Sequence, residues 1–207
     1  GKKFPPEQIM FTPNPIPPIT SGPTHQLAGP TILFVGRLHP QKGVDYLLRA
    51  FAALTAPDWH LLIVGEGTQL ANLEAMSEEL GIDAQITFTG AVKDPTPYYR
   101  SADIFVLPSR YEGTPNALME AMCHGLPVVI SDASSGPLDL VEESDAGIVT
   151  STGDVHALMH ALQRLINDSA LRKRLSANAW ECMEKKRKQK AQNRTMNDYY
   201  QSKARNH

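Results

Sequence analysis

The sequence Arg-Tyr-Glu-Gly-Thr-Pro-Asn-Ala-Leu-Met-Glu-Ala-Met-Cys-His-Gly at residues 110–125 sets two carboxylates, Glu112 and Glu120, on either side of a turn that contains glycine and proline. An apolar run at 104–107 precedes this stretch and predicts a buried strand. Residues 116–123 predict a helix. Glu112 therefore lies in a loop at the carboxyl end of a strand, and Glu120 lies within the helix that follows.

The start of that helix lies between the two carboxylates and offers an anion site. The first N–H groups of a helix have no partner within it, and together with the helix dipole they favour a phosphate group. Ionised carboxylates accept hydrogen bonds from hydroxyl groups. This arrangement fits a sugar nucleotide, with the diphosphate at the helix and the ribose and sugar hydroxyls at the carboxylates.

Strand-like and helix-like segments alternate on both sides of this stretch. We expect strands over 31–35, 60–64, 86–89, 104–107, 128–130 and 148–149, and helices over 44–54, 70–80, 116–123, 158–166 and 171–180. Such alternation predicts an α/β fold, a Rossmann-like parallel sheet with helices on both faces. Right-handed crossovers bring the carboxyl ends of all strands to one edge, where ligands bind. The loops at 36–43 and 110–115 both reach that edge, so we expect them to converge.

Three motifs resemble those of one enzyme family. Glu112 to Ala121 resembles the Glu-x7-Glu motif of retaining GT-B glycosyltransferases of the GT4 type. Residues 36–43, Gly-Arg-Leu-His-Pro-Gln-Lys-Gly, resemble the Gly-Arg-Leu-x-x-x-Lys-Gly loop of that family, and 136–139 resemble a small turn that precedes a helix in it. The resemblance covers roughly residues 9–200 and implies the C-terminal, donor-binding half of a GT-B fold.

The resemblance assigns roles to four charged residues. Arg37 and Lys42 bind the donor diphosphate, whose developing negative charge fixed cations stabilise as the glycosidic bond breaks. Glu112 accepts hydrogen bonds from the donor sugar, and Glu120 accepts them from the ribose. The implied catalytic residues are therefore Glu112, Arg37 and Lys42. Solvated loop charges remain the alternative for Arg37 and Lys42, and a surface-facing glutamate remains the alternative for Glu120.

Backbone groups complete the expected donor site. The residues expected to touch the donor beyond the four charged ones are Gly36, Thr89, Gly90, Val92, Asn116, Ala117 and Leu118. By resemblance, the stretch at 89–92 contacts the nucleotide base, and the amides at 116–118 donate to phosphate. Thr114-Pro115 departs from the family, in which many relatives have Phe-Gly, so the resemblance does not fix the donor geometry there.

Composition limits the possible partners and cofactors. The 207 residues carry a net charge of −2, which gives no sign of a nucleic-acid partner. The two cysteines form no disulfide framework and no zinc spacing, and no signal peptide is visible, so we expect a cytoplasmic protein. The sequence has no Asp-x-Asp motif, and Arg37 and Lys42 can serve in place of a cation. We therefore expect neither a metal nor another cofactor.

The two ends of the chain differ from its middle. Residues 1–30 hold half of the 16 prolines and predict a linker, in which Asn14-Pro15-Ile16 resembles the interdomain hinge of the family. We expect the nucleotide-sugar domain over 31–184 and a basic helix or tail over 185–207. That basic segment is either a solvated helix face or a contact with anionic lipid headgroups on the inner face of the membrane.

The expected function is sugar transfer from a nucleoside diphosphate sugar, UDP rather than GDP, to a glycan or lipid-linked acceptor. The resemblance implies that a separate N-terminal domain binds the acceptor, so this chain alone should transfer no sugar. Two alternatives remain open, namely another GT-B enzyme such as a nucleotide-sugar epimerase, and a non-catalytic module that binds nucleotide sugars.

Overall fold

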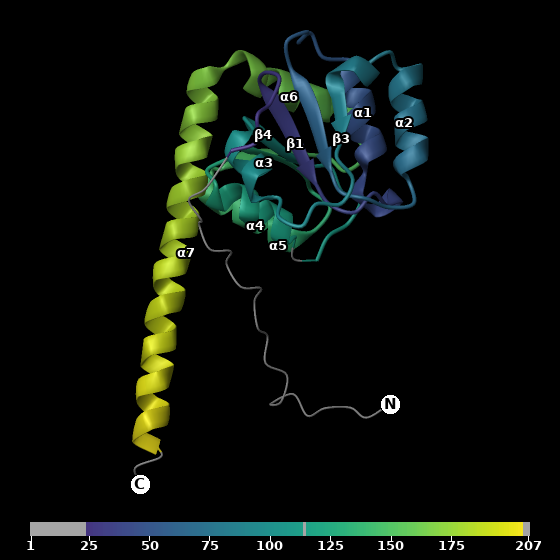
Figure 1. Ribbon diagram of the computed structural model, residues 1–207. Coiled ribbons are helices and arrows are strands. Elements are labelled where there is room, and N and C mark those ends of the chain that lie inside the picture. Colours follow the sequence, from purple (N-terminus) through teal and green to yellow (C-terminus); the bar gives the residue numbers. More distant parts are fainter. Residues whose placement is uncertain (1–23, 114, 205–207) are drawn as a thin grey trace.

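The computed structural model describes residues 24–113 and 115–204, with side chains described through residue 192. Most of the predicted linker, including the Asn14-Pro15-Ile16 segment, lies outside the described residues, as does Thr114. Strands and helices alternate along the described chain (Figure 1). The strands are β1 (Thr31–Val35), β2 (His60–Val64), β3 (Ile86–Phe88), β4 (Ile104–Leu107), β5 (Val128–Ser131) and β6 (Gly147–Thr150). The helices are α1 (Val44–Ala52), α2 (Leu70–Glu79), α3 (Thr96–Ser101), α4 (Asn116–Cys123), α5 (Ser135–Ser144), α6 (Val155–Asn167) and α7 (Ser169–Ala204), with 3-10 turns η2 (Pro40–Lys42) and η3 (Asp83–Gln85).

The strands form one six-stranded parallel sheet in the order β3-β2-β1-β4-β5-β6. The chain order reverses between β1 and β4, where Ile32 pairs with Ile104 and Leu33 with Phe105. In open α/β sheets, ligands bind outside the carboxyl ends of the strands at such a switch point. The predicted α/β class is confirmed, and the topology predicts a ligand site at the switch point between β1 and β4.

Both faces of the sheet are covered, which explains the apolar character of its strands. The side chains of Ile32, Leu33 and Phe34 have no exposed surface. One face packs against α1, α2 and α6, and the other packs against α3, α4 and α5 and against α7 residues such as Ala179 and Met183. Parallel strands buried on both sides read as continuous apolar runs rather than alternating ones, as in β1 here.

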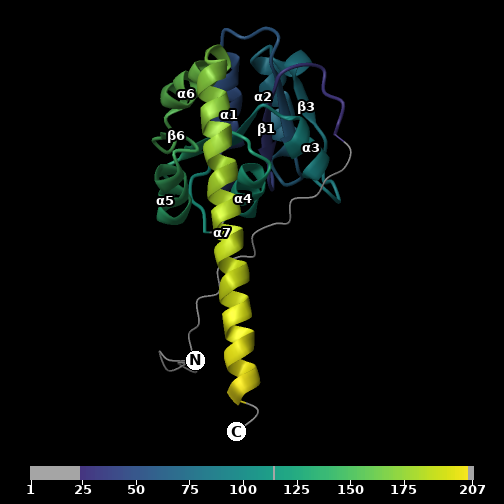
Figure 2. The same cartoon turned by 90° about the vertical axis from the view of Figure 1, so that its left-hand side faces the viewer.

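Helix α7 is longer than the sequence pattern predicted. Its buried residues Leu171, Leu175, Ala179 and Met183 recur every four positions and form one stripe against the domain. Beyond Met183, no residue through position 192 is buried, and the helix continues away from the domain (Figure 2). The helix passes without a break through 184–185 into the segment expected to be a basic helix or tail. Within the described residues, no helix is both long and apolar enough to cross a bilayer.

One local prediction was wrong, and one helix was missed. Residues 136–139 were expected to form a turn before a helix, but they lie inside the first turns of α5. Proline is tolerated in a first helical turn because its missing N–H would have no partner there, so Pro137 does not prevent the helix. The pattern also gave no sign of α3, a six-residue helix with Pro97 at its start.

Candidate functional site

The loops after β1 and β4 meet at the carboxyl edge of the sheet, on either side of the switch point. Lys42 from the first loop and Glu112 from the second form an ion pair, with 2.6 Å between Nζ and Oε1. Their side chains are 16% and 7% exposed, so the pair is largely removed from water. The predicted convergence of the two loops is confirmed, and it brings a cation and a carboxylate together.

Glu112 is held by neighbours from two strand ends. The hydroxyl of Ser109, at the end of β4, donates to Glu112 Oε1 at 2.6 Å. The Glu112 backbone N–H donates to the hydroxyl of Ser134, which follows β5, at 2.8 Å. A carboxylate fixed by its backbone and by two side chains is oriented before any ligand arrives.

The glycine that ends the β1 loop is required by its geometry. Gly43 has a φ of 64°, and a Cβ added there would lie 2.1 Å from the carbonyl oxygen of Pro108. Only glycine permits both this conformation and this close approach. The β1 loop thus packs directly against the backbone that follows β4. This contact keeps Lys42 beside Glu112.

A pocket of 290 Å³ adjoins the carboxyl ends of β1 and β2. Gly36, Arg37, Glu66, Val92 and Pro95 contribute to its lining, so the predicted residues Gly36, Arg37 and Val92 lie around one hollow. The Arg37 side chain is exposed, and the structure shows no ion pair for it among the described residues. It therefore remains available to an anion that enters the pocket.

The loop after β2 supports this pocket in a way that the sequence did not reveal. The Gly65-Glu66-Gly67 segment lies between β2 and α2. A Cβ on Gly65 would lie 1.9 Å from the carbonyl oxygen of Gly36, and one on Gly67 would lie 2.3 Å from that of Leu38. Gly65 N–H also donates to the Gly90 carbonyl at 2.9 Å. These glycines let three loops pack backbone against backbone.

Thr89 and Gly90, predicted to lie near the base, belong to the same layer of loops. The Thr89 hydroxyl donates to the Gly90 carbonyl at 2.9 Å, and Gly90 has a φ of 69°. The carbonyl of Gly90 is thus engaged by two donors within the protein. Val92 is the member of this predicted group that lines the pocket beside Gly36.

Helix α4 begins where the sequence predicted. Asn116, Ala117 and Leu118 form its first turn, and the residue that precedes the turn, Pro115, makes no side-chain hydrogen bond to it. The Leu118 side chain is fully buried, so only its backbone could reach a ligand. The three amides lie at the positive end of the helix, next to the Glu112 loop.

Glu120 has a partner that the sequence analysis missed. The hydroxyl of Tyr99, from α3, donates to Glu120 Oε2 at 2.9 Å, and Tyr99 is only 1% exposed. Burial, followed by the charge of Glu120, raises the pKa of Tyr99 well above its ordinary value. A buried tyrosine that faces a carboxylate fixes one of its oxygens and orients the whole group.

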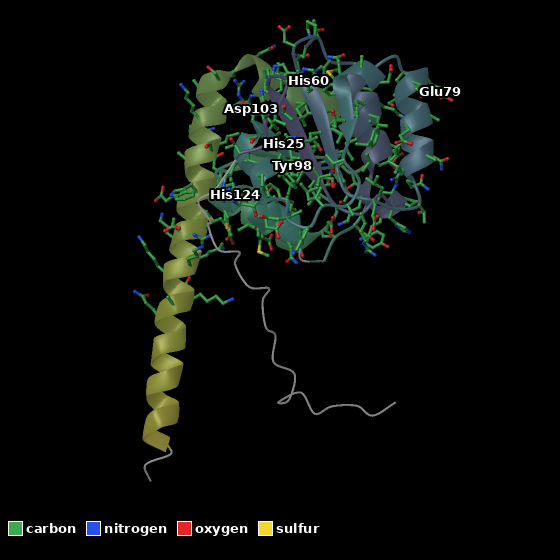
Figure 3. All side chains as sticks on the ribbon, in the orientation of Figure 1. His25, His60, Glu79, Tyr98, Asp103 and His124 are labelled. Atoms are coloured by element: carbon green, nitrogen blue, oxygen red, sulfur yellow. The ribbon has the colours of Figure 1, made fainter. Side chains whose placement is uncertain are left out.

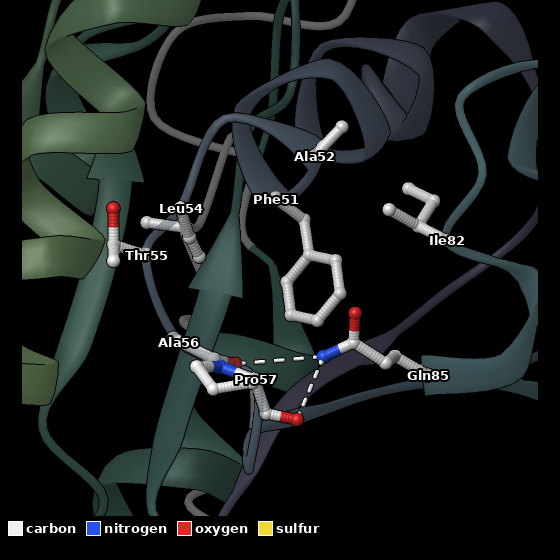
Figure 4. A pocket seen from close by; sticks show the side chains of 8 residues that line it. All are labelled: Phe51, Ala52, Leu54, Thr55, Ala56, Pro57, Ile82 and Gln85. Carbon is white, nitrogen blue, oxygen red and sulfur yellow. Dashed lines mark hydrogen bonds between the residues drawn. The ribbon is translucent and has the colours of Figure 1, made fainter.

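A second hollow has a different lining. It lies at the amino edge of the sheet and is lined mostly by apolar side chains, with Thr55 and Gln85, whose amide donates to the carbonyls of Ala56, at 3.4 Å, and Pro57, at 3.2 Å (Figure 4). His60 and His124 come from different elements (Figure 3). No three His, Cys, Asp or Glu side chains in the described chain are grouped to hold a metal ion.

Comparison with known proteins agrees with this geometry. The family model described as "Glycosyl transferases group 1" matches residues 22–181. An uncharacterized glycosyltransferase of Haemophilus influenzae is 36% identical over 172 residues, which cover 82% of this chain and 49% of that protein. The chain therefore spans about half the length of this relative.

Solved structures show the same fold. WaaG, a glycosyltransferase involved in lipopolysaccharide biosynthesis, superposes with a TM-score of 0.71 at 25% identity, covering 77% of this chain and 44% of WaaG. The structure of Anabaena Alr3699/HepE in complex with UDP gives a TM-score of 0.72 at 24% identity, covering 76% of this chain and 44% of that protein. The sheet and its helices thus have the architecture of the C-terminal half of GT-B glycosyltransferases, and the chain belongs to the family of glycosyl transferases group 1.

Proposed function

We propose that this chain is the donor-binding half of a retaining glycosyltransferase of the GT4 type, and that its donor is a UDP-sugar. The observation that supports this most strongly is the Lys42–Glu112 pair at the topological switch point. In this pair, a group that binds phosphate lies beside a group that binds hydroxyls. A nucleotide sugar carries phosphate and hydroxyl groups close to each other, so it can contact both residues.

Each part of the donor has a matching group. The diphosphate lies against Lys42, Arg37 and the first-turn amides of α4, which stabilise the charge of the leaving group without requiring a metal ion. Glu112 accepts hydrogen bonds from the sugar, and Glu120, oriented by Tyr99, accepts them from the ribose. The apolar part of the pocket near Val92 suits the base. The UDP complex of HepE, which has the same fold, supports uracil as that base.

The acceptor is expected to bind to a second half of the enzyme. The chain spans 49% of its Haemophilus influenzae relative, which leaves room for a separate acceptor domain. A glycan or lipid-linked acceptor is consistent with the role of WaaG in lipopolysaccharide biosynthesis. In this proposal transfer takes place in the cytoplasm, and the described domain binds donor without transferring sugar.

Calorimetric titration of the chain tests the proposal directly. We expect UDP to bind with measurable heat, GDP to bind more weakly, and uridine to bind weakest because it lacks the diphosphate. Incubation with UDP-glucose or UDP-galactose and lipopolysaccharide oligosaccharides should yield no transfer product. Absence of heat with both UDP and GDP would refute donor binding, and transfer by this chain alone would refute the two-half arrangement.

We also propose that α7 gives the enzyme a peripheral contact with anionic lipid. Lys185 and Arg187 pair with Glu181 and Glu184, while Lys186, Lys188 and Lys190 are exposed on the part of the helix beyond the domain. Each lysine near an anionic surface contributes about 1 kcal/mol. Sedimentation with phosphatidylglycerol vesicles, compared with phosphatidylcholine vesicles, tests this contact, and equal binding to both would refute it.

A further inference from the structure

Arg110 joins the two loops that carry Lys42 and Glu112. Its guanidinium donates to both carboxylate oxygens of Asp45, at 2.9 Å to Oδ1 and 2.8 Å to Oδ2. Asp45 lies in the first turn of α1, directly after the β1 loop, and Arg110 lies two residues before Glu112. A bidentate pair of this kind fixes orientation as well as distance.

The remaining contacts of Arg110 go to the same loop. The guanidinium carbon lies 4.1 Å from the centre of the Tyr46 ring, and the guanidinium also donates to the carbonyl of Pro40. The Arg110 N–H donates to the Gln41 carbonyl at 2.7 Å. These partners lie on both sides of Lys42 in the sequence, so one residue holds the whole Lys42 turn.

The backbone of the Glu112 loop is tied to the same turn. The Gln41 side-chain amide donates to the carbonyl of Tyr111 at 3.0 Å, next to Glu112. The Arg110 and Asp45 side chains are 32% and 31% exposed, and neither belongs to the buried apolar clusters. An ion pair this exposed adds little to global stability. Its contacts are concentrated on the two loops, which points to a local role.

We propose that Arg110 is a positioning residue for donor binding, holding Lys42 and Glu112 at the separation that lets one nucleotide sugar engage both. This inference rests on the proposed donor-binding function. A ligand that spans the two loops needs both at once, whereas bare UDP lacks the sugar that Glu112 is proposed to bind. Loss of Arg110 should therefore weaken binding of the nucleotide sugar more than binding of the nucleotide.

The first test uses no ligand, so it stands even if the proposed function fails. Hydrogen exchange is followed at the Lys42 amide, which donates to His39, and at the Glu112 amide, which donates to Ser134. In Arg110→Ala both amides should exchange about tenfold faster, a change of about 1.4 kcal/mol in opening. The matched control is Arg174→Ala, which removes the more exposed pair with Asp145 away from both loops. Unchanged exchange at both amides in Arg110→Ala would overturn the inference.

The second test measures affinity for UDP and for whichever of UDP-glucose, UDP-galactose and UDP-N-acetylglucosamine binds the unaltered chain best. Arg110→Ala and Asp45→Asn should each lower the affinity for the UDP-sugar about tenfold more than the affinity for UDP. The double variant should lose no more affinity than either single variant. Arg110→Lys should restore only part of the loss, because lysine cannot form the fork. Equal losses for both ligands, or additive losses in the double variant, would overturn the inference. If the unaltered chain binds no UDP, the proposed function fails and the exchange test alone decides the role of Arg110.

Discussion

Lys42 Nζ lies 2.6 Å from Glu112 Oε1, across 70 residues of sequence. The two groups proposed to bind different parts of the donor thus bind each other in this structure. If Lys42 binds the diphosphate as proposed, the diphosphate competes with Glu112 for it. We therefore expect the pair to lower the affinity for a bare diphosphate and to favour a ligand that binds both groups.

Glu112→Gln should raise the affinity for UDP by roughly threefold or more, because Lys42 loses its charged competitor in a pair that is largely removed from water. The same change should weaken the UDP-sugar, which loses a charged acceptor. Calorimetry at fixed ionic strength measures both affinities. Glu66→Gln is the matched control, since it removes the same charge from an exposed glutamate in the neighbouring pocket. If both variants raise UDP affinity equally, the cause is the overall field and the pair has no special role.

Lys42→Ala and Arg37→Ala should separate binding from stability. Both variants should lower the affinity for UDP about tenfold or more, since each removes a charge-assisted contact. Both should leave the affinity for uridine unchanged. Only Lys42→Ala should lower the free energy of unfolding, by about 2–3 kcal/mol, because it leaves the 7% exposed Glu112 without its cation. Arg37 is exposed, so its loss should change stability by less than about 0.5 kcal/mol. Urea unfolding gives the stabilities, and a large loss in Arg37→Ala would contradict this division.

Tyr99→Phe should reveal how Glu120 is oriented. The variant loses the hydrogen bond to Glu120, worth about 1.5–3 kcal/mol for a charged acceptor. It should lower the affinity for UDP but not for 2′,3′-dideoxy-UDP, since only UDP has the ribose hydroxyls that are proposed to bind Glu120. Titration with the two ligands tests this, and an equal loss for both would show that Tyr99 acts elsewhere.

Tyr99 should also make stability fall at alkaline pH. Its pKa in the folded state is raised above the ordinary value of 10.0, first by burial and then by Glu120. Its contribution is therefore fully present below pH 10.0 and is lost as pH rises further, because the unfolded chain releases the proton first. The stability gap between the native chain and Tyr99→Phe should narrow above that pH in urea titrations. A gap between the two chains that stays constant above that pH would contradict this assignment.

Gly65→Ala should damage both the fold and the site. Its Cβ would lie 1.9 Å from the Gly36 carbonyl oxygen, so the β1 loop must move, at a cost of about 3 kcal/mol. Gly81→Ala is the control, with a φ of 68° and open space around its Cβ, and should cost about 1 kcal/mol. Thermal unfolding and UDP titration should show lost affinity only in Gly65→Ala. Similar behaviour of the two variants would mean that backbone strain, not contact with Gly36, sets the cost.

The sequence carried enough information for the sheet and for the convergence of its loops. Apolar runs such as Thr31–Val35 are typical of strands buried on both faces, and parallel topology then brings Lys42 and Glu112 to one edge. Their direct contact was not predictable, because the pattern places loops at an edge without fixing distances between side chains. The residue roles derived from the resemblance remain predictions.

The features that escaped prediction depend on tertiary packing. Nothing local marks Arg110 as the partner of Asp45, or Tyr99 as the partner of Glu120, since each pair joins different elements. Helix α7 was predicted as a helix over 171–180 and a separate basic helix or tail over 185–207, because its later part lacks apolar periodicity. Residues 184–192 are nevertheless strong helix formers, and their helix propensity indicated that the helix continues.

The separation of Lys42 and Glu112 along the chain has a consequence for folding kinetics. Their contact closes a loop that contains β2, β3 and β4, and such non-local contacts form only after the entropy of loop closure has been overcome. An intermediate in which only β1, β2 and β3 have assembled would have a sheet but no ion pair. Recovery of UDP binding during refolding should therefore lag behind recovery of helical circular dichroism, because binding requires this non-local contact to have formed.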